Sequence, residues 1–328
     1  MTKIKKFFIA NVDMLFCFLL LALIFVVCLN PSPYISATYK GFCVWAKIVL
    51  PSLFMFFILT KLLMQMNGSF KMFGFLDKPF KKMYGVNKYG GYVFLMSILS
   101  GYPIGAKLTS EFYEQGLISQ SEARRMLSFT STSGPMFVVG SVAIKMFNNV
   151  KLGIVVFICH ILSSLINGFL YRKTELSDTT ITPLPTGKTA TKQTLNDIML
   201  NSIISLLMVG GYIALCFCLL EGLLHNQIGS AINSFLTQTF GNDFLTPIIS
   251  GIVEVTNGCV SLSSIGGNLR AVCVILTCLT SFGGLSIHLQ SQMFASKCGI
   301  KYSFFLKTKT TQTLISLVLS LIACLIFF

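Results

Sequence analysis

Charged residues are scarce in this sequence, and acidic residues are the scarcest. Asp, Glu, Lys and Arg together make up 11% of the 328 residues, and 11 acidic residues stand against 25 Lys and Arg. Soluble globular chains carry roughly a quarter charged residues, because these side chains cover the surface that faces water. The scarcity therefore excludes an ordinary soluble enzyme or binding module.

Metal-binding residues are also few and badly spaced. The sequence has 3 His, and its 11 Cys include no Cys-x-x-Cys pair and none at ligand spacing from a His. Structural metal sites are built from such clusters, so we expect no metal and no other cofactor. The cysteines lie almost all within apolar segments, where reduced Cys packs as a small apolar side chain.

Apolar residues, by contrast, make up 54% of the chain and gather in long runs. Residues 14–29 (MLFCFLLLALIFVVCL) are 16 consecutive apolar residues, and FFIA at 7–10 extends them. About 20 such residues cross the hydrocarbon core of a bilayer. A cleaved signal peptide is the alternative, but NPSP at 30–33 replaces a small-x-small cleavage site. We predict an all-α polytopic membrane protein with about seven spanning helices and two re-entrant or broken helical hairpins. Its apolar segments lie near 7–29, 43–65, 89–115, 122–147, 151–171, 196–220, 245–268, 271–294 and 310–328.

The net charge of +14 would point to nucleic acid in a soluble protein. In a membrane protein, Lys and Arg instead fix the orientation of the chain, because they stay in the cytoplasmic loops. We therefore expect the lipid bilayer as a partner and no nucleic acid. A homodimer is an open alternative.

An internal repeat divides the chain. After a shift of 150 positions without gaps, seven residues of the first half fall on identical residues of the second. This predicts an N-terminal transmembrane helix and loop (1–40), a first repeat (41–171), a polar cytoplasmic linker (172–195) and a second repeat (196–328). The matching residues are Leu50 and Leu200, Ser52 and Ser202, Ser100 and Ser250, Gly101 and Gly251, Thr130 and Thr280, Ser131 and Ser281, and Gly134 and Gly284.

The charges of two matching loops predict that the repeats have inverted topology. Loop 66–88 carries five Lys, whereas its counterpart 222–243 carries no Lys or Arg, so the first is expected inside and the second outside. If each long segment crosses once, while the segments at 89–115 and 245–268 enter and return on the same side, 19 of the 25 Lys and Arg become cytoplasmic. Among them are those of a predicted loop at 297–309. Each of the two matching loops also has the apolar pattern of an interfacial amphipathic helix, at 70–80 and 228–240.

Glycine, proline and hydroxyl residues interrupt the apolar segments at four places. These are SGYP (100–103), TSTSGP (130–135), SGIVEVTNG (250–258) and TSFGGLSIH (280–288). Unpaired backbone groups are tolerated in a membrane only where protein or a water-filled cavity covers them. Transporters built from inverted repeats place their substrate site at such breaks, near the midplane. The alternative for a single Gly or Ser is close helix packing, or a hydroxyl bonded back to its own helix.

A site at these breaks would suit an anion, because a half-helix that follows a break presents free N–H groups. Glu254 lies in one interrupted segment. Placing a carboxylate in the membrane costs about 2.5 kcal/mol or more, so such a residue is expected to serve a function or to pair with a cation. Arg270 or Lys107 would be such a partner. His160 stands alone in an apolar helix and is expected to be packed, whereas His288 follows a break. The candidate substrate-binding residues are Ser100, Gly101, Tyr102, Pro103, Lys107, Thr130, Ser131, Ser133, Gly134, Glu254, Thr256, Asn257, Thr280, Ser281, Gly284 and His288.

Residues 100–142 (SGYPIGAKLTSEFYEQGLISQSEARRMLSFTSTSGPMFVVGSV) closely resemble the sporulation integral membrane protein family of endospore-forming Firmicutes. SGIVEVTNG at 250–258 resembles the second-half signature of this family. The resemblance covers most of the chain from about residue 40 and implies that each repeat is a nucleoside-recognition, or Gate, domain. The Gate superfamily also includes nucleoside transporters and spore maturation proteins.

The resemblance implies a function as well. Members of the sporulation family are expected to move dipicolinate from the mother cell across the outer forespore membrane. Dipicolinate is a small dianion, which suits half-helix N-termini and hydroxyl groups. In this chain Lys107 would add a positive charge, and the ring of the substrate would stack on Tyr102.

Three other functions are alternatives. A nucleoside or nucleobase carrier of the Gate superfamily would use Glu254 and Asn257. An intramembrane serine protease would pair a Ser of STSG (131–134) with His160 or His288. Because hydroxyl-rich motifs recur in both halves, a symmetric site is favoured over one nucleophile, and no enzyme activity or catalytic residue is expected. A scaffold or signalling subunit without flux is the third alternative, against which the interrupted helices argue.

Overall fold

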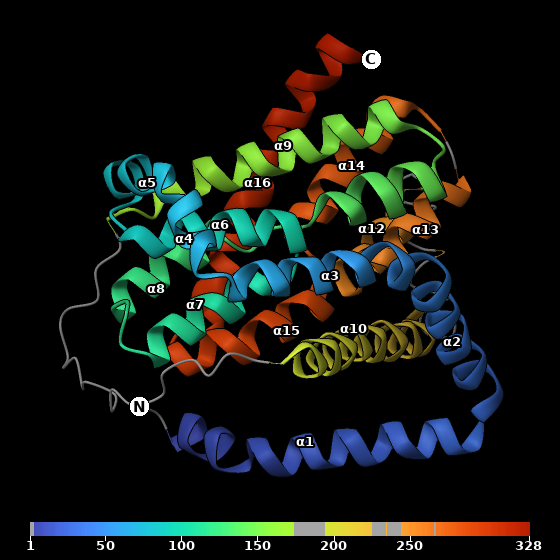
Figure 1. The fold of residues 1–328 in the computed structure, drawn as a ribbon. Helices are drawn as coiled ribbons and strands as arrows, with labels where there is room; N and C mark the ends of the chain where they lie inside the picture. The colour runs from blue at the N-terminus through green and yellow to red at the C-terminus, as the bar shows by residue number, and fades with distance from the viewer. Residues whose placement is uncertain (1–2, 174–193, 225–233, 235–243, 266) are drawn as a thin grey trace.

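The computed structural model describes residues 3–173, 194–224, 234, 244–265 and 267–328. Within these ranges every regular element is a helix (Figure 1), which confirms the all-α class. Four described helical segments are long and apolar enough to cross a membrane, or five if a bent pair at the N-terminus counts as one more. The chain is therefore a multi-pass membrane protein, and the count of seven spans stays a prediction. The four segments are Val150–Leu170, Leu195–Glu221, Leu269–Cys298 and Tyr302–Phe327.

The N-terminal pair is bent by 99° between helix α1 (Lys3–Leu29) and helix α2 (Pro31–Val44). Pro31 is the first residue of α2, a position where the missing N–H of proline has no partner to lose. Residues 31–40, predicted as part of a loop, are therefore helical. In Figure 1, α1 runs apart from the body of the protein, and α2 leads back to it. Most of the described apolar side chains of α1 are exposed from Met14 onward, as on a helix that faces lipid.

Helix α2 continues through a five-residue π-helical turn (Trp45–Val49) into α3 (Leu50–Gln65). The amphipathic helix predicted at 70–80 is wrong, because three short helices replace it. Phe80, on the predicted apolar face, is buried, and Phe75, which lies outside that face, is 71% exposed. The face was therefore predicted correctly, and the continuity of the helix was not. A 3₁₀ turn that begins at Gly74 interrupts the helical periodicity. The short helices are α4 (Asn67–Met72), η2 (Gly74–Leu76) and α5 (Asp77–Tyr84). The counterpart predicted at 228–240 lies outside the described residues.

Two interrupted helices and one long helix complete the first half. Gly101–Pro103 separates the first two helices, and residues 128–134 form a non-helical segment later in the chain. Both interruptions fall at the predicted positions. The helices are α6 (Lys88–Ser100), α7 (Ile104–Glu114), α8 (Gln120–Leu127), the π-helix η3 (Met136–Met146) and α9 (Val150–Leu170).

The second half has a similar order of elements, with breaks at Glu254 and at Gly283. The last helix begins at Tyr302 and not near residue 310, so Lys309 lies inside a helix. Its predicted place in a cytoplasmic loop is wrong, because hydropathy alone assigns the polar start of this helix to a loop. The described helices are α10 (Leu195–Leu224), α12 (Leu245–Val253), α13 (Val255–Ile265), α14 (Leu269–Phe282), α15 (Gly284–Ala295), η4 (Ser296–Cys298) and α16 (Tyr302–Phe327).

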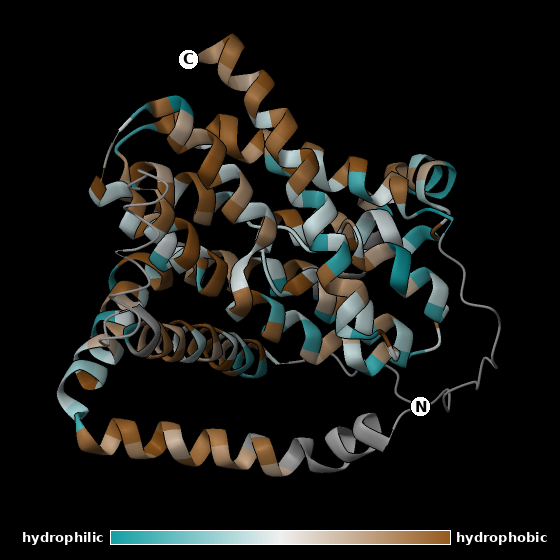
Figure 2. Ribbon diagram, turned by 180° about the vertical axis from the view of Figure 1, so that it is seen from behind, coloured by the Kyte–Doolittle hydropathy of each residue, from teal (hydrophilic) through white to brown (hydrophobic). Residues whose placement is uncertain are grey.

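The interrupted helices occupy the middle of the molecule. Helices α9, α14 and α16 pack on one another, while α3 and α10 contact the broken helices from another side. Figure 2 shows that the described part of α1 and the C-terminal end of α16 are almost wholly hydrophobic, whereas hydrophilic residues lie among the central segments. Lipid-facing helices thus enclose backbone that could not itself face lipid.

Candidate functional site

The two breaks of the first half cross each other at very short range. Gly101 has φ +76°, and a Cβ built on it would lie 2.7 Å from the backbone nitrogen of Gly134. A Cβ on Gly105 would overlap the carbonyl oxygen of Thr130. The hydroxyl of Ser97 donates to that same carbonyl, and it lies 2.7 Å from the hydroxyl of Thr132. Glycine is needed here because two backbones touch.

The two breaks of the second half meet in the same way. Gly284 has φ +69°, and a Cβ on it would lie 2.9 Å from the carbonyl oxygen of Gly251. A Cβ on Gly258 would collide with the backbone of Gly251 as well. The contacting glycines of this half stand 150 positions after the contacting pair of the first half, Gly101 and Gly134.

His160 on α9 links the breaks of one half to those of the other. Its Nε2 accepts the backbone N–H of Ser133 at 2.9 Å, and its Nδ1 lies 3.0 Å from the hydroxyl of Ser281. Since Nε2 accepts, a neutral ring carries its proton on Nδ1 and donates it to Ser281. Tyr102 makes a second link, because its hydroxyl donates to the carbonyl of Thr280 at 3.3 Å. The four breaks therefore meet at one place.

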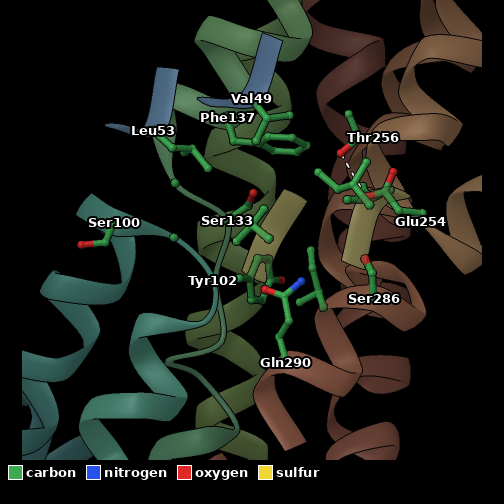
Figure 3. Close-up of a pocket in the computed structure, with 16 residues that line it drawn as sticks. Val49, Leu53, Ser100, Tyr102, Ser133, Phe137, Glu254, Thr256, Ser286 and Gln290 are labelled. Atoms are coloured by element: carbon green, nitrogen blue, oxygen red, sulfur yellow. Dashed lines mark hydrogen bonds between the residues drawn. The ribbon is translucent and has the colours of Figure 1, made fainter. Parts of the chain in front are cut away.

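A cavity of about 50 Å³ lies at this meeting point (Figure 3). Its polar wall comes from both halves, and Figure 3 shows Tyr102 and Gln290 opposite the apolar side chains of Val49 and Leu53. Seven of the predicted site residues line it: Ser100, Gly101, Tyr102, Ser133, Gly134, Glu254 and Thr256. The other lining residues are Val49, Leu53, Phe137, Val209, Ile213, Val255, Ser286, Ile287 and Gln290.

Glu254 is buried at this cavity and caps the helix that follows it. One carboxylate oxygen accepts from the hydroxyl of Thr256 at 3.0 Å, and the other accepts the backbone N–H of Asn257 at 2.7 Å. Glu254 itself is extended, so α13 begins anew after it. Neither proposed cationic partner pairs with it. Arg270 donates to the carbonyl of Phe328, and Lys107 pairs with another residue. The free N–H groups of a helix N-terminus hold the carboxylate.

Several predicted residues lie near the cavity without lining it. Lys107 is one turn into α7, where its ammonium lies 3.9 Å from the carboxylate of Glu111. His288 is buried between Tyr302, whose hydroxyl lies 3.0 Å from Nδ1, and the carbonyl of Phe282, 2.8 Å from Nε2. These contacts join α14, α15 and α16. The remaining residues, Pro103, Thr130, Ser131, Asn257, Thr280, Ser281 and Gly284, belong to the breaks but not to the cavity wall.

Three buried hydroxyls at the first two breaks have no hydrogen-bond partner among the described residues. They belong to Ser100, Thr130 and Ser131. A buried polar atom left unpaired costs about 1–3 kcal/mol. Of the three, Ser100 lines the cavity, where its hydroxyl is available to a ligand or to water.

Lys309 on α16 is the residue that the sequence analysis missed. It is 1% exposed, and its ammonium donates to the hydroxyl of Tyr102 at 2.8 Å, to the carbonyl of Ser131 at 2.8 Å and to the side-chain oxygen of Gln312 at 2.9 Å. A polar stripe that continues through Ser316 marks the inward face of α16. Its spacing of three and four residues is the signal in the sequence that would have revealed Lys309.

One curated protein shows what this chain is similar to. The chain is 30% identical over 310 residues to the sporulation integral membrane protein YlbJ of Bacillus subtilis (strain 168), and the match covers 86% of this chain and 76% of that protein. No family model matches the chain. No solved structure matches it either.

Proposed function

Since this chain belongs to the family of sporulation integral membrane proteins, we propose that it carries a small carboxylate across a membrane. The proposed substrate is dipicolinate, moved from the mother cell to the forespore through the outer forespore membrane. The role in sporulation and the place in a membrane are supported by the similarity to the sporulation integral membrane protein. The choice of a carboxylate as substrate is supported by the polar groups at the helix breaks. The protein is not proposed to be an enzyme.

The observation that carries the proposal is the meeting of four helix breaks around one cavity. Unpaired backbone inside a membrane protein lowers its stability, because each unsatisfied group costs several kcal/mol. A packing role alone needs no cavity between the breaks. Transporters use such breaks to present backbone groups and helix ends to a substrate near the midplane.

The two glycine contacts support an internal structural repeat, and the charges of the two loops are the argument for its inversion. Gly101 touches Gly134, and Gly251 touches Gly284, at an offset of 150 in both cases. Equivalent residues thus make equivalent contacts in the two halves. A cavity between two such halves is suited to alternating access, in which one half moves against the other.

The size of the cavity supports a closed conformation. About 50 Å³ is far below the roughly 300 Å³ or more that ligand pockets usually enclose. It holds water molecules but not an aromatic ring. The halves must therefore separate before a substrate such as dipicolinate enters, as alternating access requires.

The hydrogen bonds of His160 support a role without catalysis. A serine nucleophile needs a base that accepts its proton. The lone pair of His160 is taken by the backbone N–H of Ser133, and its Nδ1 proton points to Ser281. The imidazole is thus a donor toward the hydroxyl of Ser281, whereas a general base would have to accept the proton of that hydroxyl.

A nucleoside carrier is the second candidate. The amide of Gln290 and the hydroxyls of Ser286 and Ser133 line the same cavity. Amides and hydroxyls are the groups that bind a sugar or a base edge. A neutral substrate would, however, leave the buried ammonium of Lys309 without an anion.

The first test is uptake by purified protein in liposomes. Labelled dipicolinate is expected to enter liposomes that contain the protein and not protein-free ones, and excess dipicolinate is expected to compete where uridine does not. Ser131→Ala and Glu254→Gln are expected to reduce the uptake. Uridine uptake without dipicolinate uptake would transfer the proposal to nucleosides, and uptake of neither would contradict transport of both classes.

A further inference from the structure

Lys309 presents a buried positive charge for which the described residues supply no carboxylate partner. The ion pairs among these residues join Lys107 to Glu111 and Lys297 to Glu114, near the ends of their helices. The three acceptors around the Lys309 ammonium are a phenol, a backbone carbonyl and an amide. All three are neutral.

The contacts of Lys309 match the donor set of a charged ammonium. The single proton of the Tyr102 hydroxyl is directed to the carbonyl of Thr280, so this hydroxyl accepts from Lys309. The carbonyl of Ser131 and the amide oxygen of Gln312 are acceptors only. Lys309 therefore donates three hydrogen bonds, which is the full donor set of an ammonium, whereas a neutral amine has two.

A charge in this position is unfavourable by itself. Removing an ammonium from water costs several kcal/mol, which hydrogen bonds to neutral groups offset only in part. Ionisable residues inside membrane segments are for this reason presumed to serve a function, and they pair with one another or with backbone carbonyls. The described residues give Lys309 a backbone carbonyl but no counter-charge, and an anionic ligand would provide one.

Tyr102 connects Lys309 to the cavity. Its side chain lines the cavity, its hydroxyl binds the ammonium, and the ammonium lies 4.9 Å from the centre of its ring. Lys309 itself does not line the cavity. A rotation of this one ring away from Thr280 would expose the ammonium to the space where the four breaks meet.

We propose that Lys309 binds a carboxylate of the substrate. In the closed state the hydroxyl of Tyr102 accepts from the Lys309 ammonium, and the substrate carboxylate takes the place of this hydroxyl when it binds. This rests on the proposed function and names the residue that selects the anion. The substrate carboxylate replaces the phenol oxygen as an acceptor for Lys309. The unpaired hydroxyls of Ser131 and Thr130 lie on the segment that Lys309 binds, where they are available as further donors.

The test compares an anion with a neutral molecule of the same shape. Binding of dipicolinate and of pyridine-2,6-dicarboxamide is measured on the purified full-length protein. In Lys309→Met the affinity for dipicolinate is expected to fall about 10- to 100-fold, because a charge-assisted hydrogen bond is lost. Affinity for the diamide is expected to stay within about 3-fold, and Lys309→Arg is expected to keep most of the preference for the anion.

Two further variants complete the test. Lys307→Met is the matched control, because Lys307 stands two positions earlier on α16 and is exposed, and it is expected to bind as wild type. Tyr102→Phe is expected to raise the affinity for dipicolinate several-fold, since the hydroxyl no longer competes for the ammonium. If Lys309→Met does not fold, the Arg and Phe variants decide by the same ratio of affinities.

The outcomes separate this inference from the proposed function. Wild-type protein that binds no carboxylate would overturn the proposed function and the inference together. Wild-type binding of dipicolinate with an unchanged anion-to-diamide ratio in Lys309→Met would overturn the inference alone. An equal loss of affinity for both ligands would assign Lys309 a structural role and would overturn it as well.

Discussion

Glu254 and Lys309 are both buried ionisable residues, yet their charges are stabilised differently. The carboxylate of Glu254 accepts from its own helix N-terminus, within three residues of the chain. The ammonium of Lys309 reaches across to Tyr102 and Ser131, about 180 to 210 positions earlier. A local partner is visible in the sequence and a distant one is not. The sequence analysis selected Glu254 because a carboxylate is costly in an apolar segment, and it assigned Lys309 to a loop because the start of α16 is polar.

Removal of the Glu254 side chain should destabilise the protein measurably. In Glu254→Ala the N–H of Asn257 and the hydroxyl of Thr256 lose their acceptor inside the protein, which costs about 1–3 kcal/mol. Glu254→Gln keeps one acceptor oxygen and should cost less. The measurement is the free energy of unfolding in mixed micelles titrated with SDS.

Glu114→Ala is the control for this prediction. It removes a carboxylate from an exposed ion pair with Lys297, and such pairs contribute about 1 kcal/mol or less. Equal destabilisation by Glu254→Ala and Glu114→Ala would contradict the capping role.

The prediction that Lys107 binds the substrate overlooked a local partner. Lys107 pairs with Glu111, four positions later on the same helix, and does not line the cavity.

At the scale of elements, the breaks are local features with distant partners. Gly101 and Pro103 interrupt a helix wherever they occur in one, because glycine favours positive φ and proline lacks an N–H. The sequence therefore placed both breaks of the first half correctly. It could not show that the two broken segments touch, since that contact depends on how α6 and η3 cross.

The close contact between the two breaks predicts that one added methyl group, at Gly101, disrupts the protein. Gly101→Ala would place a Cβ 2.7 Å from the backbone of Gly134 and strain a backbone with φ +76°. We expect loss of dipicolinate uptake and a stability loss above about 3 kcal/mol, the upper cost of such a strained backbone alone. Uptake in liposomes and unfolding in SDS measure the two effects.

Gly116→Ala is the matched control for the crossing. Gly116 also has positive φ, at +69°, but a Cβ there would meet nothing within 4 Å. It should show the backbone strain without the collision, and uptake should persist. Similar losses in both variants would mean that strain, and not the contact between the breaks, explains the need for glycine.

The prediction of one continuous helix at 70–80 was wrong because of a local break in the chain. The apolar residues of this segment recur at helical spacing, but Gly74 begins a 3₁₀ turn that separates α4 from α5. Phe80 still packs into the core together with Tyr84 and Phe94. The periodicity thus identified an inward-facing residue and not the continuity of the helix.

At the scale of the whole molecule, two halves of opposite orientation would place the cavity between them. The evidence in the sequence is the distribution of Lys, which is abundant at 66–88 and absent from 222–243. Positive loops remain in the cytoplasm because their transfer across the membrane is unfavourable. The equivalent glycine contacts agree with such a repeat.

Inverted topology predicts opposite accessibility of these two loops. Epitope tags are inserted after Met72 in one variant and after Asn242 in another, and uptake of dipicolinate shows that each variant is folded. In right-side-out vesicles an antibody should bind the tag after Asn242 and not the tag after Met72. Detergent should make both accessible, and access to both loops from the same side would rule out the inverted repeat.

Composition and local pattern by themselves determined that this chain is an all-α protein of the membrane, and where four of its helical segments break. These properties follow from hydrophobicity, proline and glycine, which act on nearby residues whatever the rest of the chain does. Tertiary structure alone decided which breaks touch, which seven predicted residues line the cavity, and that Lys309 lies against Tyr102. Such contacts join residues up to 207 positions apart, and only the packing of the helices brings them within hydrogen-bonding distance.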